Sequence, residues 1–509
     1  MNLKLEKIEI FLYVLIYVIT WVLIKFIASP NLDLYGDMLE NFAWSQTIEW
    51  GTYKHPPFFS WVVAVWFRIF PKTNVSYYLL SYVNSGIGLI GIYYLCRAFG
   101  LRKIALASAL LMAFALPYST LAGKFNANSI LLSLWPWTCW AYIKSINSNK
   151  SSGFIYSALL SLLGTICILG KYYSLVFLFS LFLVSLLNKN SRSWYFTYKP
   201  YLVVFLSVGL LTPHLIWLVQ HDFVTLKYVA DQGTENIPYK SIRNFMCLPV
   251  LFWLIPLSIL SLLISKEKKS VISIFKVFIF SWFPKNTNDQ LFYIAILPWF
   301  ISLLFGIFAV VQLSSPWAIP IGFCYTILWL RNNETNVNDR AHKIIKIIFF
   351  IGLFFSFFLS FAYGKWQSHI NSKGYYLPRE EMSKIVNLIW QQKYSKNELR
   401  WIGGAWPENA AIAFYGENRA RVIPDLPDTY PATINPVINW EKEAGIFVCP
   451  AVKASKEYEN ELKPCVSKYK EWIKSKGKKP EIIYLKARKE GWRFTNNIFF
   501  NYAVVIYIP

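Results

Sequence analysis

Three carboxylates follow the first long apolar run of the chain at helical spacing. Asp33, Asp37 and Glu40 come just after residues 8–28, in a protein that otherwise keeps charge away from its apolar segments. On a helix, the spacing i, i+4, i+7 would place all three on one face. Carboxylates crowded at a membrane surface repel one another and gain nothing from lipid. The cluster therefore predicts a site that handles a cation, a metal or a proton.

The composition is that of a membrane protein. Apolar residues make up 55% of the 509 residues and charged residues only 16%, against about 25% charged in a typical soluble domain. The mean hydropathy is +0.36. Aromatic residues reach 18%, and many lie near the ends of apolar runs, where Trp and Tyr anchor at the level of the lipid head groups. The net charge of +23 fits basic cytoplasmic loops, with or without an additional surface for anionic lipid or phosphate.

Apolar runs predict a polytopic helical body of about eleven transmembrane helices. The first run lacks a small-residue cleavage site after it, which favours a retained anchor over a cleaved signal peptide. The run 57–70 is too short to cross and starts after two prolines, so we expect an interfacial helix there. The expected spans are 8–28, 76–96, 104–121, 128–146, 154–170, 172–188, 200–219, 245–265, 291–313, 316–331 and 344–363.

The basic residues between these runs indicate an orientation. With the amino terminus in the cytoplasm, the loops rich in Lys and Arg all fall inside, as the positive-inside rule requires. The outer side then receives residues 30–56, the loop 124–128, the hinge 170–173, the stretch 221–245 and everything after about residue 364.

Several basic residues on the outer side break this bias and need another explanation. Basic groups near acyl-chain depth can hold a lipid phosphate, and snorkelling to the head groups is the alternative. Lys171 stands out because it lies between two apolar runs with almost no loop to solvate it. The residues concerned are Lys54, Lys124, Lys171, Lys227, Lys240 and Arg243.

Residues 364–509 carry short or alternating apolar runs in place of the long runs of the membrane part, residues 1–363. They predict a small soluble α/β domain on the outer side. Of the seven cysteines, Cys449 and Cys465 fall in this domain, where an oxidising compartment would favour a disulfide between them. The expected strands are 410–415, 445–449 and 502–507, and the expected helices are 380–391 and 456–474.

Several short segments resemble a known group of enzymes. They are Gly36–Asn41, Trp50–Pro57, Lys124–Asn128, Gly170–Ser174, Pro213–Trp217 and His221–Phe223. Together they resemble the C-type superfamily of membrane glycosyltransferases. This superfamily includes the lipid A aminoarabinose transferase, the rhizobial lipopolysaccharide galacturonosyltransferases and the protein O-mannosyltransferases. The likeness is good over residues 1–260 and weak in the tail.

The resemblance implies a bacterial inner-membrane enzyme with a periplasmic C-terminal domain. Such an enzyme, a hexosyl- or pentosyltransferase, moves a sugar from a polyprenyl-phosphate donor to an acceptor such as lipid A or another envelope glycan. Its expected partners are these substrates and the membrane lipid, and no nucleic acid. The resemblance places the catalytic carboxylate of the first outer loop, residues 30–75, at Asp37, with Glu40 beside it. Relatives often carry a second acid in the next outer loop, where this chain has Asn126 and Asn128. A two-carboxylate mechanism therefore does not carry over directly.

The chemistry can also be derived from the side chains. A departing lipid phosphate must be neutralised, which basic groups in a dry cleft do well. An oxocarbenium-like sugar needs stabilisation, and an acceptor hydroxyl needs a general base such as Asp37. The chain has no glycine-rich nucleotide loop, which is consistent with a lipid-linked donor. The candidate donor and substrate residues are Lys54, His55, Lys124, Asn126, Asn128, Lys171, Tyr172, His214, His221 and Arg243.

Plainer roles stay open for several of these residues. Asp33 fits a helix N-cap, and Glu40 fits support of Asp37. Lys54 and His55 fit a rigid turn before the interfacial helix.

Plainer roles also stay open for candidate residues further along the chain. Asn126 and Asn128 fit a cap of the following helix. His214 and His221 would share a helix face, and together with His55 they are candidate ligands of a divalent metal, with a structural or substrate role as the alternative.

Two rival functions share this architecture. A transporter or flippase of lipid-linked sugars usually carries ionisable residues in mid-span, whereas the carboxylates here collect in the outer loop. A glycan polymer ligase would use the same lipid-phosphate chemistry but join glycan chains instead of transferring single sugars.

Overall fold

The computed structural model divides the chain into two compact units. Unit 1 comprises Met1–Leu23, Trp50–Phe59 and Tyr78–Phe358, and unit 2 comprises Ile24–Glu49, Ser60–Tyr77 and Leu359–Pro509. The residues described are 3–33, 35–231, 239–265, 270–308, 311–333, 337–369, 376–417, 419–428, 439–451, 458–490 and 498–509.

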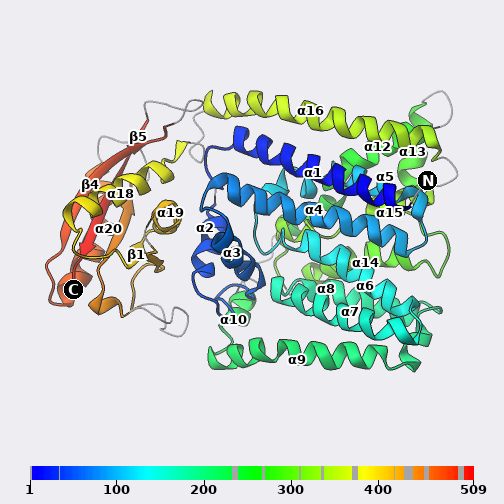
Figure 1. Cartoon of the computed structure of the whole chain (residues 1–509), viewed down its shortest axis with the longest axis horizontal. Coiled ribbons are helices and arrows are strands. Elements are labelled where there is room, and N and C mark those ends of the chain that lie inside the picture. Colours follow the sequence, from blue (N-terminus) through cyan, green and yellow to red (C-terminus); the bar gives the residue numbers. More distant parts are fainter. Residues whose placement is uncertain are drawn as a thin grey trace. The chain divides into compact units, whose positions relative to one another are not determined.

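Unit 1 is built from helices (Figure 1). Three of them, α1, α4 and α16, extend into unit 2 at one end. The helices are α1 (Leu3–Ala28), α4 (Asn74–Ala98), α5 (Ala105–Met112), α6 (Leu131–Asn147), α7 (Lys150–Gly170), α8 (Ser174–Leu187), α9 (Lys199–Gln220), α10 (Val224–Asp231), α11 (Tyr239–Phe252), α12 (Leu254–Ile264), α13 (Val271–Phe280), α14 (Gln290–Ile307), α15 (Tyr325–Asn332) and α16 (Asp339–His369).

The described helices confirm a multi-pass membrane protein but not the expected number of spans. Six are long and apolar enough to cross a membrane, and the number rises to at most eight if each bent pair forms one span. The bends lie in two expected spans. Residues 104–121 fall in Arg102–Met112 and Leu116–Gly123, bent by 76°, and residues 245–265 fall in α11 and α12, bent by 46°.

The prediction of a continuous helix at 316–331 is wrong. This stretch holds a 3-10 helix at Ser315–Ala318, a series of turns and the short α15. Pro316, Pro320 and Gly322 interrupt the apolar run, because proline removes a backbone donor and glycine disfavours a helix interior. Helix α13, which is apolar but too short to span, was not predicted from the sequence. A short apolar helix is present at the expected place as α3 (Phe58–Ile69), and its interfacial position stays a prediction.

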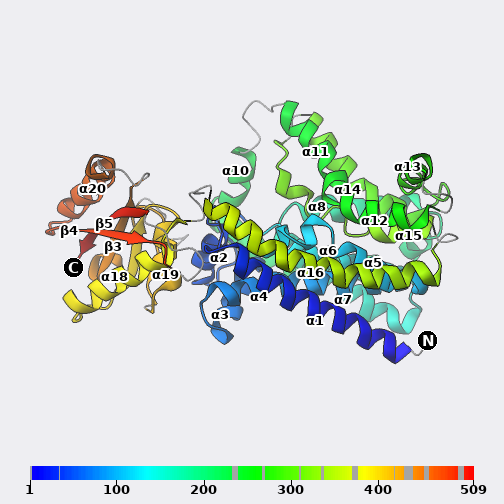
Figure 2. The ribbon, with the colours of Figure 1, turned by 90° about the horizontal axis from the view of Figure 1, so that it is seen from above.

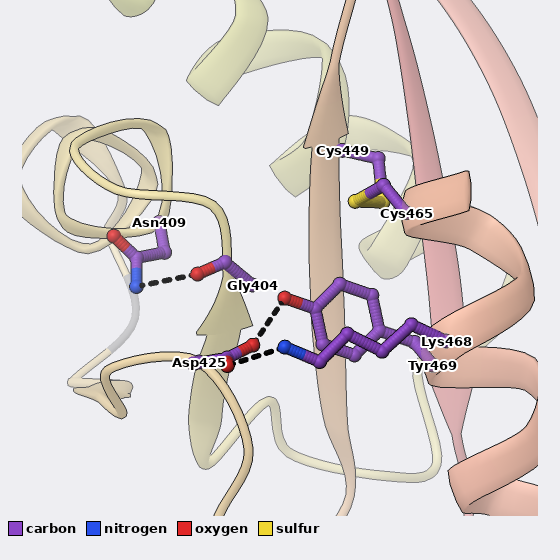
Figure 3. Close-up of a disulfide and its surroundings, with 7 residues drawn as sticks. All are labelled: Gly404, Asn409, Asp425, Cys449, Cys465, Lys468 and Tyr469. Carbon is purple, nitrogen blue, oxygen red and sulfur yellow. Dashed lines mark hydrogen bonds and ion pairs between the residues drawn. A yellow bond between two sulfur atoms is a disulfide. The ribbon is translucent and has the colours of Figure 1, made fainter. Parts of the chain in front are cut away.

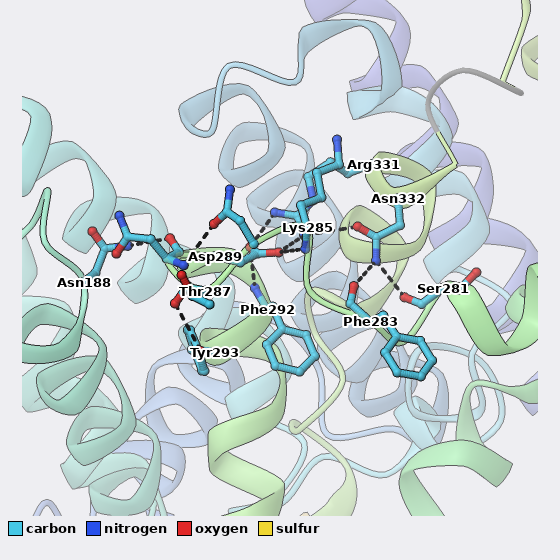
Figure 4. Close-up of polar contacts among 12 residues, drawn as sticks. Asn188, Ser281, Phe283, Lys285, Thr287, Asp289, Phe292, Tyr293, Arg331 and Asn332 are labelled. Atoms are coloured by element: carbon cyan, nitrogen blue, oxygen red, sulfur yellow. Dashed lines mark hydrogen bonds and ion pairs between the residues drawn. The ribbon is translucent and has the colours of Figure 1, made fainter.

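Polar side chains tie the helices of unit 1 together at a few points. Asn84 on α4 donates to the carbonyl oxygen of Ser129 at 2.7 Å and accepts from the Ser133 hydroxyl at 2.6 Å. Asp289 caps α14 by accepting from the backbone N–H of Phe292 at 3.1 Å, and the Arg331 guanidinium binds the same carboxylate at 2.7 and 2.6 Å (Figure 4). Arg331 of α15 therefore has a structural role at the start of α14.

Unit 2 contains a five-stranded mixed sheet, as the predicted α/β class requires. The strand order is β2-β1-β3-β5-β4, with β1 parallel to β2 and β3, and with β5 antiparallel to β3 and β4. In the register, Gly445 lies opposite both Trp401 and Tyr507. The strands are β1 (Trp401–Gly404), β2 (Arg421–Val422), β3 (Gly445–Pro450), β4 (Glu481–Arg488) and β5 (Phe499–Tyr507).

Helices cover both faces of this sheet (Figure 2). On one face, α20 (Tyr458–Ser475) completes a core in which Phe447 stacks on Tyr469 at 4.4 Å. On the other face lie α18 (Arg379–Lys393) and α19 (Glu408–Tyr415), and Trp390 of α18 packs near Ile446 and Val504.

The predicted elements of this domain are mostly confirmed. The strands at 445–449 and 502–507 and the helix at 380–391 are present. The helix expected at 456–474 is present from Tyr458 onward, and residues 456–457 lie outside the described residues. The strand at 410–415 is wrong, because this segment forms α19. A short apolar run does not distinguish strand from helix by periodicity, and the alanines of this run favour a helix. The strands β1, β2 and β4 were not predicted.

The predicted disulfide is present. Cys449 of β3 and Cys465 of α20 are bonded, with their Cα atoms 5.9 Å apart (Figure 3). Beside it, Asp425 accepts a hydrogen bond from the Tyr469 hydroxyl at 2.6 Å and pairs with Lys468. The disulfide and this pair both attach α20 to the rest of the domain.

Candidate functional site

The acid segment of the first loop forms a turn and a short helix in unit 2. Helix α2 (Asp37–Ser45) begins at Asp37. Gly36 before it has a φ of 81°, a left-handed conformation that favours glycine. Asp33 lies ahead of the helix, so the expectation that it shares a helix face with Asp37 and Glu40 is wrong. Asp37 and Glu40 both lie in the first turn.

Asp33 nevertheless has the capping role that its position suggested. Its buried carboxylate accepts hydrogen bonds from the backbone N–H groups of Gly36 at 2.5 Å, Asp37 at 3.2 Å and Met38 at 2.8 Å. The first N–H groups of a helix have no partner within the helix, and a carboxylate there is also favoured by the helix dipole. The formal N-cap residue is Gly36, so Asp33 caps the helix from further back in the chain.

The far end of α2 is bound to the C-terminal domain within the same unit. The Gln46 amide donates to the carbonyl oxygen of Ala420 at 2.8 Å and accepts from the N–H of Val422 at 2.9 Å. Phe42 packs edge-to-face on Phe414, with the ring centroids 5.2 Å apart. Helix α2 and the C-terminal domain therefore share one core. The predicted boundary at residue 363 stays a prediction, and the contacts group the chain differently.

A second group of predicted residues meets in unit 1 around Lys171. This lysine lies between α7 and α8 and is only 8% exposed. Its ammonium group donates to the side-chain oxygen of Asn128 and lies 5.6 Å from the centroid of the Trp317 ring. An amide oxygen and an aromatic face stabilise a dehydrated cation while leaving its charge in place.

Lys54 and His55 lie in a turn, as the plainer of their two predicted roles requires. The carbonyl oxygen of His55 accepts from the N–H of Thr52 at 3.0 Å and from its hydroxyl at 2.8 Å. The Lys54 ammonium lies 5.2 Å from the Tyr53 ring centroid and 5.9 Å from that of Tyr228. The turn therefore presents the cation to an aromatic surface.

The electrostatics of His55 connect it to both lysines. Burial, and then the charges on Lys171 and Lys54, hold the pKa of His55 well below its ordinary value. Cations repel one another, so a protonated imidazole is disfavoured beside two ammonium groups. His55 is consequently a neutral hydrogen-bonding group at neutral pH, in a surrounding that favours an anion.

The other two histidines are engaged by protein groups. The Nδ1 atom of His214 lies 2.5 Å from the carbonyl oxygen of Trp50, and its Nε2 atom lies 2.7 Å from the Tyr172 hydroxyl. A carbonyl oxygen only accepts, so Nδ1 carries the proton, and Tyr172 donates to Nε2 of the neutral ring. His221 places its Nδ1 atom 2.7 Å from the carbonyl oxygen of Trp217.

This arrangement offers little to the predicted metal. Across the part of the chain that the structure describes, no group of three or more His, Cys, Asp or Glu residues is placed to hold a metal ion. His214 has protein partners on both ring nitrogens, which leaves it poorly suited to be a ligand.

The remaining candidates have other surroundings. The side-chain oxygen of Asn126 accepts from the N–H groups of Asn128 and Ser129, each at 3.0 Å, which supports the capping role left open for Asn126. Lys124 is half-buried just before this turn, and Arg243 is exposed on α11.

The partners of these charged groups could not be predicted from the sequence. Trp317 and Tyr228 face the lysines, but in a chain with 18% aromatic residues no spacing singles them out. Arg379, whose guanidinium donates a hydrogen bond to the backbone carbonyl oxygen of Asp33, was not singled out from the sequence either. A signal existed, because a cation at the first position of a helix opposes the helix dipole.

The chain is similar to known proteins in one segment and in its overall fold. Residues 54–217 match the family model described as dolichyl-phosphate-mannose-protein mannosyltransferase. A search of curated proteins gives no significant match. The structures of ArnT from Cupriavidus metallidurans, bound to undecaprenyl phosphate and in the apo state, both match with 12% identity and a TM-score of 0.62, over 98% of each chain. The oligosaccharyltransferase of Archaeoglobus fulgidus in the apo form matches at 10% identity over 89% of this chain and 71% of that chain, with a TM-score of 0.44.

The chain therefore has the fold of a C-type membrane glycosyltransferase, and the resemblance predicted from its short segments is confirmed. Its fold is similar to that of ArnT, its described helices make it a multi-pass membrane protein, and residues 54–217 match the mannosyltransferase model.

Proposed function

We propose that this protein is an inner-membrane glycosyltransferase that moves one sugar from a polyprenyl-phosphate donor to an acceptor on the periplasmic face. The observation that carries the proposal is the cluster of Lys171, Lys54 and His55, a partly dehydrated cationic surface. Lys54 and Lys171 lie within the segment that matches a family acting with a dolichyl-phosphate sugar. The similar fold of an ArnT crystallised with undecaprenyl phosphate supports a lipid carrier.

The donor half of the reaction breaks the bond between the anomeric carbon and a phosphate oxygen. Negative charge grows on the prenyl phosphate as it leaves. Buried cations stabilise that charge far better than cations in water, because the surroundings have a low dielectric constant and need no reorganisation. In this proposal Lys171 and Lys54 bind the phosphate, and neutral His55 adds a hydrogen bond.

The acceptor half forms a bond between an acceptor oxygen and the anomeric carbon. The proton of the acceptor hydroxyl passes to the carboxylate of Asp37, which acts as the general base. Glu40, in the same turn of α2, supports this group. The acceptor that the sequence resemblance suggests is lipid A or another envelope glycan.

The test is transfer by the purified full chain in lipid nanodiscs, with a radiolabelled polyprenyl-phosphate sugar and lipid A. We expect one labelled sugar on each acceptor molecule. Labelled blocks of polymer would indicate a ligase. Carrier-bound label that only crosses the bilayer of proteoliposomes would indicate a transporter, and either result would overturn the proposal. Mass spectrometry of lipid A and envelope glycans from a deletion strain would identify the acceptor.

A further inference from the structure

A buried arginine of the C-terminal domain lies where a cation is unfavourable. Arg379 is the first residue of α18 and is only 3% exposed. The amino-terminal end of a helix carries partial positive charge, so a guanidinium there needs compensation. Glu408, the first residue of α19, supplies a carboxylate oxygen 3.8 Å from the guanidinium Nε atom. That atom makes no hydrogen bond, so the ion pair alone does not satisfy the guanidinium.

The short contact of Arg379 is made to the first loop. Its Nη1 atom donates to the backbone carbonyl oxygen of Asp33 at 2.8 Å. The same Asp33 uses its carboxylate to hold the N–H groups of Gly36, Asp37 and Met38. One residue thus connects the guanidinium to the start of α2, through its carbonyl on one side and its carboxylate on the other.

Packing closes the same turn from the outside. A Cβ atom added to Gly36 would lie 2.6 Å from Cβ and 2.9 Å from Cγ of Pro407. Pro407 directly precedes Glu408, so the start of α19 touches the turn as well as the arginine. With Gln46 bound to β2 at the other end of α2, both ends of the helix that carries Asp37 are attached to the C-terminal domain.

We propose that Arg379 is a positioning residue for the Asp37 carboxylate, acting through Asp33, so that the C-terminal domain sets the geometry of the first-loop acid. The proposal rests on the function proposed above. An arginine at this position would hold the turn in the conformation in which Asp37 meets the acceptor hydroxyl. A small displacement of a catalytic group is costly, about 100-fold in rate for about 1 Å.

The chain offers a matched control for loss of a buried cation. Lys489 is 4% exposed, belongs to the same domain and pairs with Glu381 at 3.2 Å. Replacing it by alanine removes a buried ion pair without removing the bond to Asp33. A merely structural role for Arg379 predicts that the two alanine variants behave alike.

The experiment compares Arg379→Ala, Arg379→Lys and Lys489→Ala as full chains in nanodiscs. We expect Arg379→Ala to lower kcat about 100-fold while the donor KM changes less than about twofold. Arg379→Lys should recover roughly tenfold of that loss, because an ammonium can still donate to the Asp33 carbonyl. Lys489→Ala should keep kcat within about twofold of wild type, even where its Tm falls. Equal losses of kcat in the two alanine variants, or a raised donor KM with unchanged kcat for Arg379→Ala, would overturn the proposal.

A second measurement is independent of the reaction. Hydrogen exchange at the amides of residues 36–38 should become faster in Arg379→Ala and stay slow in Lys489→Ala. Unchanged protection in Arg379→Ala would contradict the positioning role even if transfer were lost. If the wild-type chain transfers no lipid-linked sugar, the proposed function fails, and the exchange data still decide whether Arg379 holds the turn.

Discussion

The basic and the acidic candidate residues belong to different compact units and are held in different ways. In unit 1, Lys171 contacts an amide oxygen and an aromatic ring. In unit 2, Asp37 begins a helix that is capped by Asp33 and joined to the C-terminal domain by Gln46. The first arrangement keeps a positive charge, which we propose binds the donor phosphate, and the second fixes the position of Asp37, the proposed base. Changes in unit 1 should therefore act on donor binding, and changes in unit 2 should act on turnover.

The most severe test of this division is Asp37→Asn. We expect kcat to fall on the order of 1000-fold, because an amide cannot accept the acceptor proton, while the donor KM stays near that of wild type. Asp222→Asn is the control, since Asp222 is exposed and asparagine tolerates its φ of 52°. Wild-type turnover by Asp37→Asn would remove this residue from the mechanism.

Lys171→Ala tests the other unit. A hydrogen bond to a charged group contributes roughly 1.5–3 kcal/mol, so the donor KM should rise about 10- to 100-fold with the acceptor KM unchanged. Steady-state kinetics with each substrate varied separately distinguish the two. Lys103→Ala, at an exposed lysine, should match wild type. A raised acceptor KM with an unchanged donor KM would be the opposite result.

Removal of the disulfide tests whether unit 2 can be weakened by itself. Cys449 and Cys465 are 16 residues apart, and a closed loop of about that length contributes roughly 3 kcal/mol to the free energy of unfolding. The double serine variant should therefore unfold at a lower denaturant concentration and keep its donor KM. Cys247→Ser, at an exposed free cysteine, is the control. An equal loss of stability in the control, or a weakened donor affinity in the double variant, would contradict this prediction.

The smallest expected effect is a pH dependence of stability from His55. Its pKa is lowered by burial and by Lys171 and Lys54, so below its ordinary value of 6.5 the unfolded chain binds a proton that the folded chain does not. Stability should therefore fall as the pH drops below about 6.5, by at most about 1.4 kcal/mol for each pH unit. Thermal unfolding between pH 7.5 and 5.5 measures this slope.

Two variants sharpen this measurement. His55→Phe should flatten the slope because it removes the titrating group. Lys171→Ala should reduce the slope, because one of the repelling charges is lost and the pKa of His55 rises. Equal slopes in wild type and His55→Phe would show that other groups cause the dependence.

Some of this molecule follows from local sequence and some does not. The long apolar runs predicted α1, α4, α9 and α16, since a span needs only length and hydropathy. The pairing of Cys449 with Cys465 followed from two cysteines in one domain that was predicted to be exported. The helix at 408–415 was mistaken for a strand, because tertiary packing decides short apolar segments.

The candidate site divides in the same way. Residue types and a family likeness pointed to Asp37 and Lys171. Nothing local indicated that Gln46 pairs with Ala420 and Val422, residues of a distant part of the chain. The aromatic partners of the lysines were hidden for a similar reason, because contacts between distant segments leave no periodic pattern.

The close fit of Gly36 against Pro407 bears on how such a protein could be re-engineered. A chimera that takes its tail from another protein would have to take the matching first loop as well, because the turn before Asp37 has no room for a side chain. Shortening the chain to its helical body would likewise strip the guanidinium from Asp33. The first-loop turn and the C-terminal domain should therefore be exchanged together, because they are distant in the sequence but in contact in the structure.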